Sequence, residues 1–155
     1  MEEIDMYSRK LLMIGAIALL TGCASSSGGR YADVNAVVPK LSPDRGRVYF
    51  YRSASVVGAA IQPDIKLNGE TVGRAVPGGF FFIDRPKGSY EASTATEVET
   101  MLAFTLAAGE TKYIRTSITP GFFAGHMQFE VVGRPVAEAE LASLNQTART
   151  DVASR

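Results

Sequence analysis

The chain has 155 residues, and its 16 basic and 16 acidic side chains give a formal net charge of zero. This length favours a single domain, and the balanced charge excludes a nucleic-acid-binding protein with a broad basic face. A single cysteine and a single histidine exclude an intramolecular disulfide and a metal centre of clustered cysteines or histidines. We therefore expect no metal and no cofactor.

A ten-residue apolar run follows an Arg-Lys pair near the N-terminus and covers residues 11–20. A membrane-spanning helix needs about 20 residues, so this run is too short to cross a bilayer. It does fit the core of a secretory signal peptide, which has roughly 7–15 apolar residues. Acidic residues are unusual before such a core, and either Met1 or Met6 is compatible with the start. We predict a signal helix within residues 1–22.

The apolar run ends in Leu20, Thr21, Gly22 and Cys23. This order resembles the lipobox of bacterial lipoproteins, and it therefore implies that residues 1–22 are removed. It also implies that Cys23 carries a diacylglycerol and that its new amino group is acylated, for instance with palmitate. Two or more acyl chains give stable membrane anchoring. The alternative is an inert buried cysteine after a short hydrophobic helix.

The residue after the cysteine is an alanine and not an aspartate. This resembles the sorting pattern for the outer membrane. We therefore expect a lipid-anchored protein on the periplasmic face of the outer membrane, in which Cys23 is used as an attachment point and not as a nucleophile. Removal of the leader would leave 14 basic and 13 acidic residues, a net charge of +1. This charge implies no electrostatic attraction to lipid headgroups.

Residues 23–45 are predicted to hold the lipidated cysteine and a flexible tether. The stretch begins with three serines and two glycines within residues 25–29. A random tether over residues 24–42 would span about 25 Å. Tyr31 and Val34 are apolar, however, so a second possibility is that part of this stretch packs on the domain. The sequence leaves both possibilities open.

Short runs rich in aromatic and β-branched residues begin at Gly46. Asn68-Gly69 predicts a tight hairpin, because both turn positions need a positive φ. Spacing of about ten residues between runs predicts an all-β protein with an antiparallel, Ig-like sandwich of seven or eight strands over residues 46–134. The expected strands cover residues 47–52, 65–67, 71–76, 80–83, 89–94, 102–106, 112–118 and 127–131.

The composition changes after the last of these runs. Residues 135–145 are alanine-rich and predict a short helix, which is too short to be stable alone. We expect Val136, Leu141 and Leu144 to rest on the sandwich. Residues 146–155 have the composition of a polar tail.

Five motifs follow one another in the expected strands and turns: 46–52, Val72-Gly73 after Asn68-Gly69, 79–81, 86–91 and 109–113. Their order resembles the bacterial lipoproteins grouped as domain of unknown function 2846 and related PEGA-like domains. The resemblance covers about residues 46–141. It implies a β-sandwich on a lipid anchor and no agreed activity. Lys87 stands within the family's Pro-Gly turn, and Tyr90-Glu91 stands where histidine is common.

The sequence offers few candidates for catalysis. Serine-based hydrolysis needs a base beside the nucleophile, and His126 is the single histidine, with Ser53 and Ser117 as nearest candidates. Neither serine lies in a nucleophile-elbow pattern. Glu97 and Glu99 would share one face of a strand, where paired carboxylates could do acid–base work, but a solvated strand end is the favoured interpretation. We therefore predict no catalytic residues and no enzyme.

Two features could instead form a partner surface. Phe122 and Phe123 lie in an uncharged loop between two expected strands, where they would either contact a partner or plug the end of the sandwich. The apolar stretch 53–62 has the same two possibilities. Tyr49 and Tyr51 are a further candidate contact surface.

These observations favour a membrane-anchored lipoprotein that acts as a non-enzymatic interaction or structural module of the cell envelope. Its expected partners are the membrane, through Cys23, and an envelope protein, with no nucleic acid. The alternative is a periplasmic module that binds a small ligand, such as a glycan or lipid fragment. Rings such as Tyr49, Tyr51 and Phe81 would then line a pocket between loops.

Overall fold

The computed structural model describes residues 28–123 and 125–147. The predicted signal helix, Cys23 and residues 148–155 of the predicted tail lie outside the described residues. Neither described helix is long and apolar enough to cross a bilayer. The elements are α2 (Tyr31–Val37), β1 (Arg45–Arg52), β2 (Asp64–Leu67), β3 (Glu70–Arg74), β4 (Gly79–Pro86), β5 (Gly88–Ala95), β6 (Glu99–Leu106), β7 (Thr111–Thr119), β8 (His126–Val132), α3 (Arg134–Leu141) and β9 (Asn145–Gln146).

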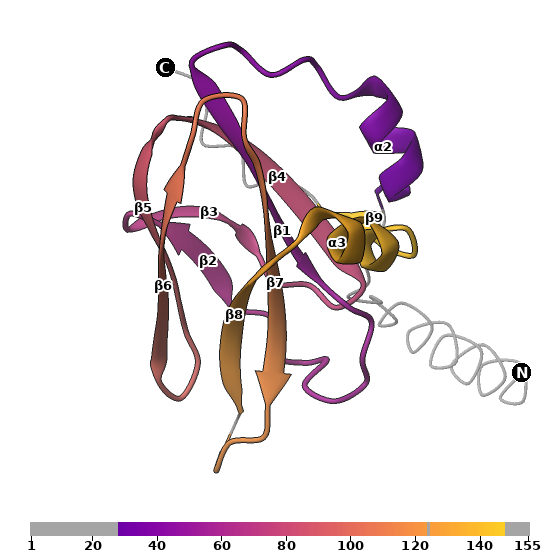
Figure 1. The fold of residues 1–155 in the computed structure, drawn as a ribbon. Helices are drawn as coiled ribbons and strands as arrows, with labels where there is room; N and C mark the ends of the chain where they lie inside the picture. The colour runs from indigo at the N-terminus through magenta and orange to yellow at the C-terminus, as the bar shows by residue number, and fades with distance from the viewer. Residues whose placement is uncertain (1–27, 124, 148–155) are drawn as a thin grey trace, which may run out of the picture.

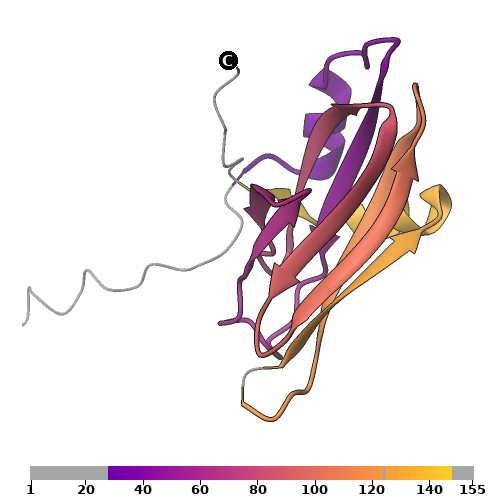
Figure 2. The same cartoon turned by 90° about the vertical axis from the view of Figure 1, so that its left-hand side faces the viewer.

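The strands form two sheets that pack face to face, with orders β8-β7-β1-β4-β9 and β3-β2-β5-β6 (Figures 1 and 2). The predicted β-sandwich is confirmed, and each of the eight expected runs lies largely on one of the strands β1–β8. Alternate side chains of both sheets meet in the core between them. The core residues include Val48, Phe50, Ile65, Leu67, Val72, Phe81, Ile83, Ala92, Phe104, Leu106, Ile114 and Met127.

The five-stranded sheet is mixed and not purely antiparallel. Its central strand β1 pairs with β7 in parallel, with Tyr49 opposite Tyr113. A parallel pair needs a long crossover connection. Here the crossover consists of the strands β2 to β6. Of these, β4 pairs with β1, and the other four form the second sheet, after which β7 runs in the same direction as β1. The short β9 also pairs in parallel, with the beginning of β4.

The predicted hairpin between β2 and β3 is confirmed. Asn68 has φ 49° and Gly69 has φ 84°. Both values lie in the left-handed region, which asparagine and glycine tolerate better than other residues. The turn returns the chain so that Leu67 pairs with Glu70.

Both helices cover the outer face of the five-stranded sheet (Figure 1). This outer layer explains why β1 is buried from Gly46 to Arg52 without alternation. Val48 and Phe50 point into the core between the sheets, whereas Tyr49 and Tyr51 pack in the layer below the helices. The molecule therefore has three layers: helices, the five-stranded sheet and the four-stranded sheet.

The C-terminal helix is present, but one of its predicted contacts is wrong. Leu141 and Leu144 are buried, as expected, whereas Val136 is 53% exposed. Ala137 fills the expected place of Val136 and is fully buried. Since Ala137 and Leu141 are four residues apart, they share one face of α3, and Val136 is rotated away from that face by about 100°.

Residues 28–31 attach to the domain at β9. The Gly28 amide donates to the Gln146 carbonyl at 3.0 Å, and the Gln146 amide donates to the Gly29 carbonyl at 2.8 Å. The Tyr31 ring is buried and meets the rings of Tyr49 and Phe80 edge-on. This part of the expected tether therefore packs on the domain, which is one of the two possibilities that the sequence left open.

Candidate functional site

Three connections gather at one end of the sandwich. Residues 53–63 follow β1, residues 96–98 join β5 to β6, and residues 120–125 join β7 to β8. They meet because β1, β5 and β7 all finish at this end, which is the lower end in Figure 1. Gly58 approaches Ile118 of β7, and Glu97 bonds to the β7–β8 connection. We call these three connections the loop end.

The Glu97 carboxylate organises the β7–β8 connection. Its oxygens accept hydrogen bonds from the Phe122 amide at 3.1 Å, the Gly125 amide at 3.0 Å and the Phe123 amide. Its Oε2 also lies 3.2 Å from Nε2 of His126. The Glu97 side chain is only 14% exposed. A partly buried carboxylate with several amide donors is well satisfied, and here it ties three amides of the loop to one acceptor.

The loop held by Glu97 presents two phenylalanines to solvent. Phe122 and Phe123 are each 88% exposed. Their rings pack edge-to-face with centroids 4.7 Å apart. Neither ring fills the end of the sandwich. Of the two possibilities that the sequence left open, the structure shows the one in which both rings face solvent. Val56, Val57 and Val98 are also exposed at the loop end.

The buried side chain of Arg52 holds the first loop. Its guanidinium donates to the carbonyls of Ile61 at 2.6 Å, Gly58 at 2.8 Å and Ala75 at 3.0 Å. Burial lowers the pKa of Arg52, because the charged form loses contact with water. Arg52 therefore fixes the path of residues 58–61 below the exposed valines.

His126 contacts a carboxylate and not a serine in the part of the chain that the structure describes. Its ring nitrogen faces Glu97, as described above. Ser117 lies opposite Gln128 in the β7–β8 register, two positions from the Thr119–His126 pair. The sequence suggested that Glu97 and Glu99 are both solvated at a strand end. In the structure only Glu99 is exposed, on β6, whereas Glu97 is bonded to the β7–β8 connection.

Tyr49 and Tyr51 do not form a contact surface. Both are only 2% exposed, and Phe81 is 1% exposed. Helices α2 and α3 cover the two tyrosines, and the second sheet covers Phe81. The prediction of Tyr49 and Tyr51 as partner-facing residues is therefore wrong, because the continuous apolar run of β1 reflects burial on both faces.

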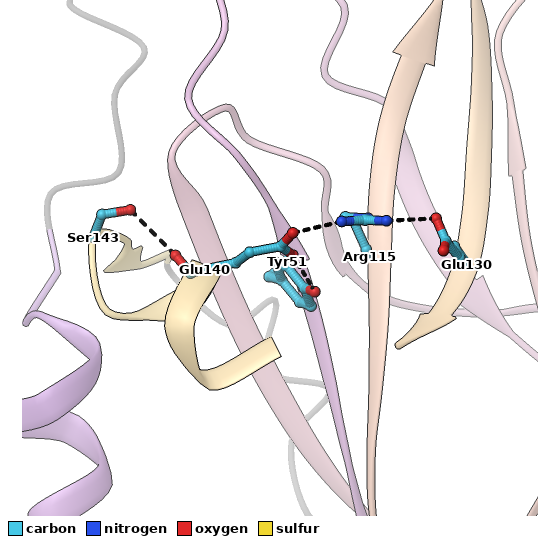
Figure 3. A network of polar contacts seen from close by, with 5 residues as sticks. All are labelled: Tyr51, Arg115, Glu130, Glu140 and Ser143. Carbon is cyan, nitrogen blue, oxygen red and sulfur yellow. Dashed lines mark hydrogen bonds and ion pairs between the residues drawn. The ribbon is translucent and has the colours of Figure 1, made fainter. Parts of the chain in front are cut away.

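The Tyr51 hydroxyl belongs to a polar network between β1, β7, β8 and α3 (Figure 3). It donates to Glu140 Oε2 at 2.6 Å. Arg115 bridges Glu140 at 2.5 Å and Glu130 at 2.7 Å. Burial, followed by the Glu140 carboxylate, raises the pKa of Tyr51, so the hydroxyl stays protonated. The network attaches α3 to the sheet.

The space beside Arg52 is small. A depression of about 140 Å³ lies between the first loop and β7 and is lined by Ser53, Ser55, Val57 and Ile118, among others. Pockets for small ligands usually measure about 300–1,000 Å³. Within the described residues, no group of three or more histidine, cysteine, aspartate or glutamate side chains could hold a metal ion.

Comparison with known families places most of this sandwich in one group. Residues 42–127 match the model of the family described as Protein of unknown function (DUF2846), which is more than half of the chain. The chain belongs to this family. The DUF2846 segment runs from just before β1 into β8, so it includes all three connections of the loop end. No curated protein and no solved structure matches the chain.

Sequence reasoning identified the exposed phenylalanines but missed Glu97 and Arg52 as the residues that hold the loop end. A glutamate before a strand has no local signature for such a role. The signal for Arg52 was its position at the end of a fully apolar strand, where an arginine must find hydrogen-bond partners if it is buried.

Proposed function

We propose that this DUF2846 chain is a non-enzymatic contact module of the bacterial cell envelope, anchored through lipid on Cys23, with the loop end as its contact surface. The observation that carries the proposal is the exposed Phe122–Phe123 pair held by Glu97. An ordered pair of exposed rings is costly in water and is typical of an interaction site.

The lipobox resemblance of residues 20–23 supports the anchored location. The chain that leads into the domain attaches beside β9 at residues 28–31. Only residues 24–27 then separate Cys23 from the first described residue, and a chain of five steps spans at most about 18 Å. The domain would therefore lie close to the membrane surface and not at the end of a long tether.

The anchor is tested by metabolic labelling with a palmitate analogue and by the mass of the purified protein. The parent should lose residues 1–22 and gain acyl chains, whereas Cys23→Ser should do neither and should leave the membrane fraction. A Cys23→Ser protein with the same processed mass and the same fractionation as its parent would overturn the proposal.

The contact role is tested by crosslinking in intact cells. A photoreactive residue in place of Phe123 should give specific adducts, and the same residue in place of Val37, which is exposed on α2, should not. Equal, unspecific labelling at both positions would contradict the assignment of the loop end as the contact surface. The small-ligand alternative gains no support from the burial of Tyr49, Tyr51 and Phe81.

A further inference from the structure

The loop end has an unusual composition for the surface of a protein in which 21% of the residues are charged. Residues 53–63 and 119–125 contain no aspartate, glutamate, lysine or arginine. The third connection contributes Glu97, whose carboxylate faces inward onto loop amides. The most exposed large apolar side chains at this end are Val56, which is 93% exposed, and the two phenylalanines, each 88% exposed.

The backbone of the β7–β8 connection is also suited to a medium without water. The amides of Phe122, Phe123 and Gly125 already donate to Glu97. A backbone amide that enters hydrocarbon must have its hydrogen bond satisfied within the protein. The loop meets this requirement at three amides next to its exposed rings.

The register of the five-stranded sheet places Gly28, where the described chain begins, toward the loop end. Gln146, which holds Gly28, pairs with Phe80, and Phe80 pairs with Tyr51, which is opposite Arg115. Strand β7 continues four residues beyond Arg115 to Thr119, a rise of about 13 Å. The link from Gly28 back to Cys23 can extend by up to about 18 Å. The anchoring residue and the loop end can therefore reach one surface.

We propose that the loop end is a second, non-covalent membrane contact, in which Phe122 and Phe123 insert into the acyl region of a phospholipid bilayer. This inference rests on the proposed anchor for its orientation. A loop with no charged side chain of its own fits a fluid apolar layer, whereas protein interfaces usually surround their apolar centre with a hydrogen-bonding rim. The contact is hydrophobic, so neutral lipids suffice and added salt has little effect.

The chain contains no tryptophan, so a single introduced tryptophan reports on one place only. The full chain with Phe123→Trp is processed in cells, purified from membranes and reconstituted into phosphatidylcholine vesicles. We expect the tryptophan emission in vesicles to lie at shorter wavelength than the emission of the same protein when it is unfolded in the absence of detergent. The emission should also lose intensity when the acyl chains of the vesicle lipids are brominated. The matched control is Val37→Trp, at an exposed position on α2 away from the loop end, and it should show neither change.

The outcomes separate this contact from the anchor. Acylated protein whose Phe123→Trp emission is unquenched overturns the membrane contact and leaves the anchor in place. In the second outcome the tryptophan is quenched, but mass spectrometry shows that Cys23 is unmodified. That result supports the membrane contact and overturns the anchor. In cells, a photoreactive residue in place of Phe122 should form lipid adducts, and a single protein adduct of defined mass would overturn the proposal in favour of a protein partner.

Glu97 acts here as a positioning residue. In the Phe123→Trp background, Glu97→Ala should reduce the quenching by brominated lipid, because the loop amides lose their acceptor. Glu99→Ala should leave the quenching unchanged, since that side chain is exposed on β6. Equal quenching in both variants would show that Glu97 does not position the tip.

Discussion

At the scale of single residues, two buried or half-buried charges decide the shape of the loop end. Glu97 accepts from the amides of Phe122, Phe123 and Gly125, and Arg52 donates to three carbonyls, two in the first loop and one in the residue after β3. Each side chain satisfies backbone groups that belong to irregular structure, where no neighbouring strand is available. Arg52 directly precedes the loop that it holds, whereas Glu97 is at least 25 residues from the amides that it holds.

We predict that Glu97→Ala destabilises the protein by about 1–3 kcal/mol, because it leaves several loop amides without their acceptor. Hydrogen exchange at the amides of Phe122, Phe123 and Gly125 should become faster. Denaturation by urea and exchange measured by mass spectrometry check both effects. Glu99→Ala is the control and should stay within about 0.5 kcal/mol of the parent. Similar exchange at the loop in both variants would contradict the role of Glu97.

A second prediction at this scale concerns Tyr51. Removing its hydroxyl with Tyr51→Phe should cost about 1.5–3 kcal/mol, since the bond to Glu140 is short and involves a charged acceptor. Tyr90→Phe removes an exposed hydroxyl that donates to the Pro86 carbonyl and should cost less. Urea midpoints of the two variants give the comparison. A larger loss for Tyr90→Phe would show that the network around Arg115 does not stabilise the fold.

At the scale of elements, α3 covers part of the outer face of the five-stranded sheet. It brings Ala137 and Leu141 onto the aromatic layer, and the residues after it form β9. The helix has only eight residues, so its stability comes from packing and not from its own hydrogen bonds. The element would not persist without the sheet beneath it.

We expect Leu141→Ala to cost about 2–5 kcal/mol, because it removes a fully buried side chain from the aromatic layer. Val136→Ala, at an exposed position near the start of the helix, should change the free energy of unfolding by less than about 1 kcal/mol. The two variants are compared by urea denaturation. Equal losses would mean that α3 is rotated relative to the face described above.

At the scale of the whole molecule, three layers share one central sheet. The layer below the helices is unusually rich in tyrosine, and burial raises the pKa of Tyr31, Tyr49, Tyr51 and Tyr113. A raised pKa in the folded state means that the unfolded chain loses these protons first. The stabilisation that comes from these buried, protonated tyrosines is fully present below about pH 10, the usual pKa of tyrosine. It is lost as the pH rises further.

The resulting prediction is an alkaline limit to stability. The urea midpoint should stay nearly constant up to about pH 10 and fall as the pH rises further, because tyrosines ionise more readily in the unfolded state. The fall should be smaller in Tyr51→Phe, which has one fewer ionisable group in the layer. A midpoint that stays constant up to pH 11 would contradict the burial of these hydroxyls.

The sequence by itself determined the strands. Their alternation, aromatic content and turn residues are local properties, so β1 to β8 and the turn at Asn68-Gly69 could be predicted. It also identified Phe122 and Phe123, although it left open whether they were exposed. The motif at Cys23 remains a prediction from the sequence, because it lies outside the described residues.

Only the tertiary structure decided which faces are covered and what holds the loops. The sequence could not show that helices cover Tyr49 and Tyr51, that β7 runs parallel to β1, or that residues 145–146 form a strand. Each of these depends on segments that are far apart in the chain. Glu97 is the clearest example, because its role arises from amides more than 20 residues away, and no local pattern can encode a contact of that kind.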